Sequence, residues 1–327
     1  MDDQEFEVDY LQKFNSFLST ASFSSTYKLV FLKSLLELAD YRISEPKSVI
    51  GHKWIQKDGT TIQVDLNFIA VPFTKYYWDM FYKFRLRQSQ TKNQYGDDDL
   101  NIHKNFKDEH GIAKKPPKTA DDLASKEYDS LRKKIIERSI RKEVLIHLSP
   151  SGFYKIVKGK SYILMDSRII SFFKKYRIIL DSAINYKITK YLEGINKSPQ
   201  IAEKVLIEVK RPSLKPEEKK LMWKFHHECF YCGTKLSPES DYAIDHVIPF
   251  DYVLKTDLYN SVPACINCNS TKSNKLPNKE KFFVKVIQRN ENMKDKWPLE
   301  DYTQESYEKL YRDCKEEYHG DREYFEL

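Results

Sequence analysis

The sequence lacks a hydrophobic run long enough to cross a membrane, and it lacks a basic-then-apolar leader. A membrane-spanning helix needs roughly 18 to 20 consecutive apolar residues, and no such run occurs in the 327 residues. A secretory signal begins with a basic segment followed by an apolar one, and that pattern is also missing. We therefore expect no membrane partner and no secretion.

Cysteine is scarce, with five residues in the whole chain. Four of them form two Cys-x-x-Cys pairs, and only Cys314 lies apart, among charged residues. This distribution does not indicate disulfides, so a reducing cytoplasm is the expected location. Internal repeats are absent as well, and the length is sufficient for two or three domains.

Positive charge is unevenly distributed along the chain. Residues 1–210 carry 36 Lys and Arg against 27 Asp and Glu, a net charge of +9, whereas residues 211–327 carry 19 against 21. Within this second part, residues 211–289 have a net charge of +4 and residues 290–327 a net charge of −6. A basic majority is compatible with a nucleic-acid partner, although solvated lysine faces produce the same composition.

The first 210 residues have the pattern of a mostly helical domain with short β-hairpins. Apolar periodicity predicts helices over residues 7–20, 27–40, 121–142 and 166–194. Hairpins are expected around Asp58-Gly59, with a strand from Thr60 to Val71, and around Lys158-Gly159. The aromatic residues of 73–86 have helical spacing, which favours a packed helix with a basic rim over a surface that stacks on bases. Residues 88–120 are polar and predict a long loop or insertion.

The strongest signal lies further on, where residues 229–232 read C-F-Y-C and residues 265–268 read C-I-N-C, separated by 32 residues. Two Cys-x-x-Cys pairs supply the four thiolates of a structural Zn²⁺ site. Gly233 follows the first pair and Asn267 lies inside the second, as expected of tight turns that aim both sulfurs at one ion. We therefore predict that Cys229, Cys232, Cys265 and Cys268 bind zinc.

Asp245 and His246 lie between the two cysteine pairs, in an Ile-Asp-His-Val-Ile-Pro run that predicts a short strand. Adjacent strand residues point to opposite faces, so one site can use both only where the strand is bent or twisted. Asn269 directly follows the last cysteine at the start of an expected helix. Oxygen ligands from Asp245 and Asn269 suit Mg²⁺, which leaves His246 free to accept a proton.

These residues resemble the HNH, or ββα-metal, endonuclease family in its four-cysteine form. The resemblance covers the four cysteines together with Asp245, His246, Pro249, Asn260, Asn269 and Lys272. It implies that Asp245 and Asn269 bind the catalytic Mg²⁺ or Mn²⁺, that His246 is the general base, and that the cysteines hold a structural zinc. It also implies that Asn260 braces the loop and orients the histidine, and that Lys272 contacts phosphate; we expect the same contact of Lys275. Asn in place of His as the last letter of the motif is a common variant of this family.

The predicted fold class is therefore α+β. We expect a mostly helical recognition or regulatory domain over residues 1–210, a zinc-stapled HNH domain over 211–289 and an acidic helical extension over 290–327. The nuclease unit is too small to choose a target well, so specificity must come from the rest of the chain or from a partner.

The expected function is Mg²⁺-dependent hydrolysis of DNA, most simply of duplex DNA, leaving 5′-phosphate and 3′-hydroxyl ends. Large unmatched extensions on such nucleases suggest restriction or anti-phage defence. One alternative is a zinc-dependent module that binds nucleic acid or a partner without cutting. Another is a nuclease subunit that is active only with a sensor protein or as a homodimer.

A rival pattern is the Glu-x-Lys spacing of Glu208 and Lys210, with Asp181 upstream, which is typical of PD-(D/E)xK nucleases. That family places the carboxylate and lysine on a strand. Here the run ends an expected helix, so we prefer the HNH interpretation.

Overall fold

The structure is a computed structural model of the chain. It describes residues 2–20, 24–40, 54–90, 117, 120–206, 211–225, 227–237, 242–278, 280–294, 302–319 and 325. The chain divides into two compact units, one of residues 1–83 with 87–195 and the other of residues 84–86 with 196–327. Apart from residues 84–86, the second unit is one continuous segment from Asn196 that includes the acidic tail. None of the helices in these described ranges is long and apolar enough to span a membrane.

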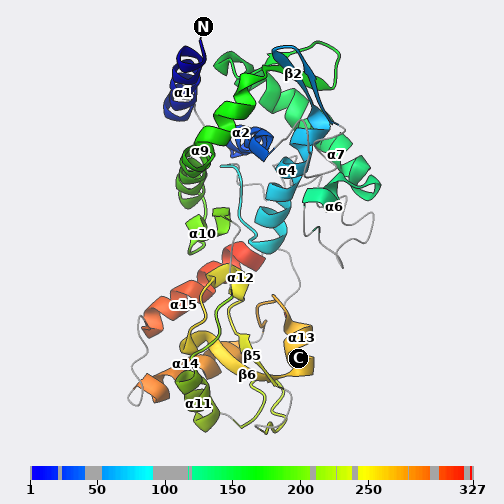
Figure 1. The fold of residues 1–327 in the computed structure, drawn as a ribbon. Coiled ribbons are helices and arrows are strands. Elements are labelled where there is room, and N and C mark those ends of the chain that lie inside the picture. Colours follow the sequence, from blue (N-terminus) through cyan, green and yellow to red (C-terminus); the bar gives the residue numbers. More distant parts are fainter. Residues whose placement is uncertain are drawn as a thin grey trace. The chain divides into compact units, whose positions relative to one another are not determined.

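The N-terminal unit combines helices with one small antiparallel sheet. Its longer helices are α1 (Asp3–Thr20), α2 (Tyr27–Leu36), α4 (Leu66–Trp78), α7 (Asp129–Ile135) and α9 (Arg168–Glu193). Shorter helical segments are η1 (Glu37–Asp40), η2 (Asp79–Lys83), α6 (Ala120–Ala124), η4 (Lys126–Tyr128), η5 (Ile136–Val144), α8 (Leu145–Leu148) and η6 (Ser149–Ser151). Helix α2 contacts both α4 and α9 (Figure 1), and its apolar residues are buried on nearly every side.

The two predicted hairpins join into one four-stranded sheet. Its strands are β1 (Ile55–Asp58), β2 (Thr61–Asp65), β3 (Lys155–Ile156) and β4 (Tyr162–Asp166), in the order β1-β2-β4-β3. The central pair β2–β4 connects segments about 100 residues apart, with Ile62 opposite Met165 and Val64 opposite Ile163. These four side chains are buried, so the sheet has one apolar face, as the period-two pattern predicts.

The strand predicted from Thr60 to Val71 is wrong in its second half. The strand ends at Asp65, whose side chain accepts a hydrogen bond from the Asn67 backbone amide and caps α4. This N-cap bond starts a helix at Leu66. The residues that follow are apolar on all sides because α4 is buried, and such a run has no period that separates helix from strand.

The aromatic residues of α4 pack inward, as predicted. Phe73, Tyr76, Tyr77 and Trp78 are all buried, and the Tyr77 hydroxyl lies 2.8 Å from the Thr26 hydroxyl. The insertion predicted at 88–120 falls almost wholly outside the described residues, as do Glu208 and Lys210 of the rival motif. Asp181 lies within α9 and pairs with Lys33 at 2.6 Å.

The C-terminal unit is built around a two-stranded hairpin. Its elements are α10 (Ile201–Leu206), α11 (Pro216–Phe225), β5 (Tyr242–His246), α12 (Phe250–Val253), η7 (Leu258–Asn260), β6 (Ser261–Cys265), α13 (Ile266–Lys272), α14 (Glu280–Lys294), α15 (Gln304–Asp313) and η8 (Cys314–His319). Strands β5 and β6 pair antiparallel from Tyr242 opposite Cys265 to His246 opposite Ser261, and α13 follows directly. This is a ββα unit, and with the helical N-terminal unit it confirms the α+β class.

Helices α14 and α15 complete the core of the C-terminal unit. Phe282 and Val286 of α14, and Tyr307 and Tyr311 of α15, belong to one buried cluster with the hairpin. Cys314 is fully buried in the same cluster. The acidic tail therefore supplies part of the core under the ββα unit.

Candidate metal centre and active site

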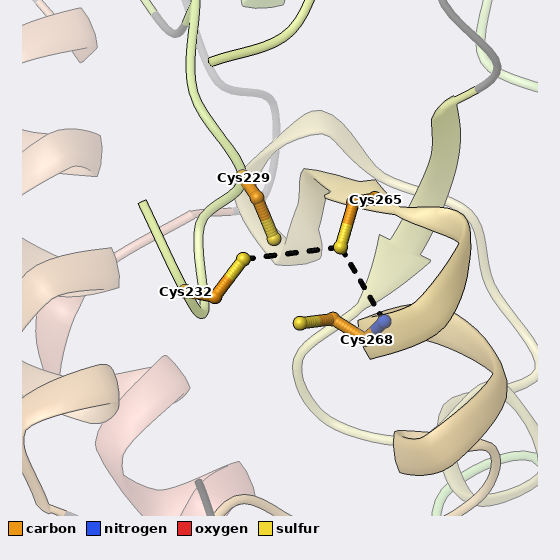
Figure 2. A group of neighbouring side chains, drawn as sticks. All are labelled: Cys229, Cys232, Cys265 and Cys268. Carbon is orange, nitrogen blue, oxygen red and sulfur yellow. Dashed lines mark hydrogen bonds between the residues drawn. The ribbon is translucent and has the colours of Figure 1, made fainter. Parts of the chain in front are cut away.

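The four cysteines of the two knuckles meet at one point (Figure 2). Their sulfur atoms all lie within 4.8 Å of one another, and the Sγ atoms of Cys232 and Cys265 are 3.8 Å apart. Gly233 has a φ of +76°, the left-handed conformation that closes the first knuckle. Cys265 is the N-cap of α13, and its sulfur accepts a hydrogen bond from the Cys268 amide.

This donor set fits zinc. Zn–S bonds are about 2.3 Å long, so a tetrahedral site places its sulfurs about 3.8 Å apart, close to the separations found. Cys229 and Cys268 are buried, and burial raises the pKa of both thiols. A bound metal ion offsets this rise in pKa because it stabilises the thiolate form of each cysteine. The cysteines therefore form a closed structural site that links the start of the hairpin unit to the start of α13.

Asp245 and His246 end strand β5 and line one cavity of about 230 Å³. The chain bends directly after His246, which is how two adjacent strand residues serve a common site. Asn269, Ser270 and Ser273 enter the same cavity from α13 and its C-terminal end. The structure thus brings together the predicted metal ligands and the predicted base.

One oxygen of Asp245 is held by two buried partners. Its Oδ2 accepts a hydrogen bond of 2.5 Å from the Tyr231 hydroxyl and lies 3.0 Å from the Lys272 amine. No partner of Oδ1 occurs within the described part of the chain. Asp245 is therefore oriented by one oxygen and can offer the other to a cation in the cavity.

The structure contradicts the phosphate contact predicted for Lys272. Its side chain is fully buried, and the amine donates to the His246 backbone carbonyl at 2.6 Å as well as pairing with Asp245. Lys272 thus ties α13 to the end of β5 from the inside. Lys275 does not line the cavity either, so its predicted phosphate contact gains no support from this arrangement.

The ring of His246 is fixed at both nitrogens. Arg211 Nη2 donates to Nδ1 at 2.8 Å, and Nε2 lies 3.0 Å from the Thr256 hydroxyl oxygen. Because a guanidinium can only donate, Nδ1 must be the unprotonated nitrogen, and Nε2 carries the hydrogen that is given to Thr256. Burial, followed by the charges of Arg211 and Lys272, lowers the pKa of His246 to about 3. The imidazole is therefore neutral near pH 7.

Arg211 and Thr256 are site residues that sequence reasoning missed. Arg211 lines the cavity, and its guanidinium lies 5.1 Å from the centre of the Phe250 ring. It precedes Cys229 by 18 residues and belongs to no recognisable motif. Thr256 lies in the turn between α12 and η7. No pattern in the sequence marks either residue.

Asn260 lies beneath the loop that follows His246. Its Oδ1 accepts from the Ile248 amide at 2.9 Å, and its Nδ2 donates to the Ile248 carbonyl at 2.9 Å. The Tyr307 hydroxyl donates to the same Oδ1 at 3.0 Å. Arg289 of α14 donates to the backbone carbonyls of Leu258, Tyr259 and Ser261, which surround Asn260. Helices α14 and α15 thus fix the position of Asn260 beneath the loop that follows His246.

Comparison with known families matches two separate parts of the chain. Residues 229–275 match the model described as HNH endonuclease. Residues 8–147 match a domain of unknown function, DUF8808. No curated protein and no solved structure matches the chain.

The HNH match begins at the first zinc knuckle, includes the cavity residues from Asp245 to Asn269, and ends just after α13. It therefore coincides with the ββα unit and its four-cysteine site. The C-terminal unit of this chain carries an HNH endonuclease domain of the four-cysteine form at residues 229–275.

Proposed function

We propose that the protein is a Mg²⁺-dependent endonuclease that hydrolyses phosphodiester bonds of duplex DNA, with His246 as general base. The observation that carries this proposal is the common cavity of Asp245, His246 and Asn269. A base and two oxygen ligands around one space are the groups that phosphodiester hydrolysis requires. The same residues on separate surfaces would be ordinary parts of a zinc-stabilised fold.

His246 is prepared to take a proton at Nδ1. Thr256 fixes the tautomer by accepting from Nε2, and Asn260 holds the adjoining loop at Ile248. A water molecule in the cavity would give its proton to Nδ1 while its oxygen attacks phosphorus. The bond from phosphorus to the 3′ oxygen then breaks, which leaves a 5′-phosphate and, after that oxygen is protonated, a 3′-hydroxyl end.

Arg211 occupies the reactive nitrogen of His246 in the absence of substrate. Its side chain is exposed and lies at the same cavity. A phosphate group is a stronger partner for a guanidinium than a neutral imidazole, because the bond is charge-assisted and can be bidentate. Substrate would therefore draw Arg211 onto the phosphate and free Nδ1 for the water.

The oxygen atoms of Asp245 and Asn269 would hold the divalent cation. A carboxylate and an amide oxygen are ligands that Mg²⁺ and Mn²⁺ accept, with water and substrate phosphate completing the sphere. When bound, the cation acts as a Lewis acid toward the phosphate and stabilises the departing oxygen. Tyr231 and Lys272 keep the Asp245 carboxylate turned toward that position.

A role in restriction or anti-phage defence accords with a small nuclease domain joined to a large second unit, and it rests on analogy. Control by a sensor protein, or by a second copy of the chain, is the main alternative for the intact protein. The contact between Arg211 and Nδ1 favours a resting state that substrate or a partner releases.

Cleavage of supercoiled plasmid DNA tests the proposal. Wild-type protein with Mg²⁺ or Mn²⁺ should nick or linearise the plasmid, and His246→Ala should lower the rate by about 10²- to 10⁴-fold, the usual contribution of a general base. His227→Ala is the matched control, because His227 is an exposed histidine of the same unit outside the cavity. It should cut like wild type.

Equal rates for wild type and His246→Ala would remove His246 as the base. Cleavage that appears only after a second protein is added would favour the partner-dependent alternative. Binding of DNA without cleavage under every metal condition would favour the alternative that the protein is a nucleic-acid-binding module that does not cut.

A further inference from the structure

The N-terminal unit gathers positive charge in one segment, residues 129–160. This segment holds nine Lys and Arg against three Asp and Glu, a net charge of +6, whereas the whole chain has a net charge of +7. The rest of the molecule is therefore almost neutral in sum. A local concentration of this kind is the electrostatic pattern expected of a polyanion-binding surface.

Two neighbouring elements carry six of these nine cations. Segment η5 buries Ile136, Ile140 and Val144, and its exposed side bears three cationic residues together with Glu137. The β3–β4 hairpin bears further exposed lysines. Together these side chains form what we call the basic surface: Arg138, Arg141, Lys142, Lys155, Lys158 and Lys160.

The two elements are joined by hydrogen bonds. Arg141 Nη2 donates to the Lys160 backbone carbonyl at 3.2 Å, which connects η5 with the end of the hairpin turn. The Tyr154 hydroxyl donates to the Leu145 carbonyl at 2.9 Å, which connects the start of the hairpin with α8. The basic surface is therefore continuous across η5 and the hairpin.

Within the described part of the chain, the cations of the basic surface differ from others of the same unit in having no carboxylate partner. Elsewhere in the unit, ion pairs join Lys13 to Asp9, Lys33 to Asp181, Arg168 to Asp166, Lys175 to Glu7, Arg177 to Glu37 and Lys190 to Glu193. Among the carboxylates that the structure describes, none lies within ion-pair distance of the basic surface. A lysine on an edge strand can serve simply to prevent strand pairing. That role would account for Lys155 on β3, but not for the cations of η5.

The surroundings of these cations indicate which polyanion fits. The aromatic residues of the segment, Phe153 and Tyr154, are buried with 1% and 4% of their surface exposed. Residues 129–160 therefore present no exposed Phe, Tyr or Trp ring on which unpaired bases could stack, and stacking is the usual means of holding a single strand. Exposed cations alone are suited to the phosphate backbone of a duplex.

We propose that the basic surface binds the phosphate backbone of duplex DNA and gives the N-terminal unit a sequence-independent hold on the substrate of the nuclease domain. The identity of the polyanion as DNA rests on the proposed function. The surface itself rests on the charge and geometry of residues 129–160.

The test is the salt dependence of binding to a 30-base-pair duplex. Two double variants of the full chain are compared in a His246→Ala background, so that no DNA is cut during the measurement. One replaces Lys155 and Lys158 by Gln, and the other replaces Lys57 and Lys174, which are exposed lysines of the same unit outside the basic surface. Both remove two charges, and all four side chains are exposed, so melting temperatures should stay unchanged.

Losing Lys155 and Lys158 should weaken binding and flatten the plot of log affinity against log salt concentration. The slope should fall by about 0.9 for each lost phosphate contact, whereas the Lys57/Lys174 variant should match its parent. Equal slopes for the two variants would overturn the proposal. Unchanged DNA binding, combined with lysine-dependent binding to phosphatidylglycerol vesicles, would overturn it in favour of a membrane partner.

The outcome is separable from that of the nuclease proposal. Lysine-dependent DNA binding by a protein that never cuts would contradict the proposed catalysis and support the basic surface. Cleavage by a protein whose DNA binding does not depend on Lys155 and Lys158 would support the proposed catalysis and contradict the basic surface.

Discussion

Each reacting group of the cavity is held in one state by a specific neighbour. Tyr231 and Lys272 take one oxygen of Asp245, and Thr256 takes one nitrogen of His246. Nδ1 of His246 accepts from Arg211, and no described residue pairs with Oδ1 of Asp245. Arg211 lines the same cavity, and under the proposed function the release of its contact with Nδ1 would distinguish a resting site from an active one.

Replacing Arg211 tests the role of its contact with Nδ1 of His246. If the guanidinium moves to the phosphate, Arg211→Ala should slow single-turnover cleavage by about 100-fold, a usual cost of losing one donor to developing charge. Arg211→Lys should recover part of the rate, since it keeps the charge but not the bidentate geometry. Faster cleavage by Arg211→Ala would contradict this role and would mean that Arg211 only masks the base.

The sequence singled out some of the residues that line the cavity and missed others, for physical reasons. Asp245, His246 and Asn269 belong to a local motif with fixed spacing, and the cavity contains all three. Lys272 belongs to the same motif but was given the wrong role, because spacing does not say that its amine turns inward under β5. Arg211 reaches the site through tertiary folding alone, which no spacing in a single sequence reports.

Among the secondary-structure elements, the zinc knuckles determine how the hairpin and α13 meet. One cysteine of each pair is buried, and Cys265 also caps α13. Loss of the metal would therefore release both the start of α13 and the first knuckle. Asp245 and Asn269 lie on the two elements that the four-cysteine site links.

Cys265→Ser should lose the bound zinc and unfold the C-terminal unit, because structural zinc supplies roughly 10 to 16 kcal/mol of binding free energy that is also folding free energy. Zinc content by mass spectrometry and thermal melting measure both effects. Cys314→Ser is the control, since Cys314 is buried apart from the zinc site in the same core. It should retain one zinc per chain. One zinc per chain in Cys265→Ser would refute the assignment.

Elements were predictable where their pattern is local. Helix α9, expected over 166–194, runs from Arg168 to Glu193 because its apolar stripe and flanking turns are both in the sequence. The strand predicted through Val71 failed at Asp65, where one capping bond outweighs the β-propensity of the residues that follow. The pairing of β2 with β4 joins two distant hairpins, and neither hairpin shows this in its own sequence.

At the scale of the whole molecule, the chain joins an HNH domain to a larger unit that partly matches a domain of unknown function. The two units carry different chemistry. The C-terminal unit contains the four-cysteine site and the cavity, and the N-terminal unit contains the basic surface. A ββα nuclease grips DNA chiefly through phosphates, so a second hold on the backbone would lengthen its stay on the substrate.

The role of the acidic tail also belongs to this scale. Its composition predicts an acidic helical extension, and Tyr307 and Tyr311 of that extension are buried in the core of the C-terminal unit. The Tyr307 hydroxyl reaches Asn260 behind the catalytic loop. Charge counts describe the exposed side of such a helix and say nothing of its aromatic face, which is why the sequence alone did not predict the contact.

If the proposed function holds, Asp245 and His246 act on the same phosphate, and a double-mutant comparison of single-turnover cleavage rates measures this directly. Asp245→Asn, His246→Ala and the double variant are compared with wild type, each first checked for one bound zinc and an unchanged fold. Groups that act as a unit are strongly non-additive, so we predict that the double variant is about as slow as the slower single variant. Losses that multiply, or a wild-type rate for Asp245→Asn, would contradict a common reaction centre.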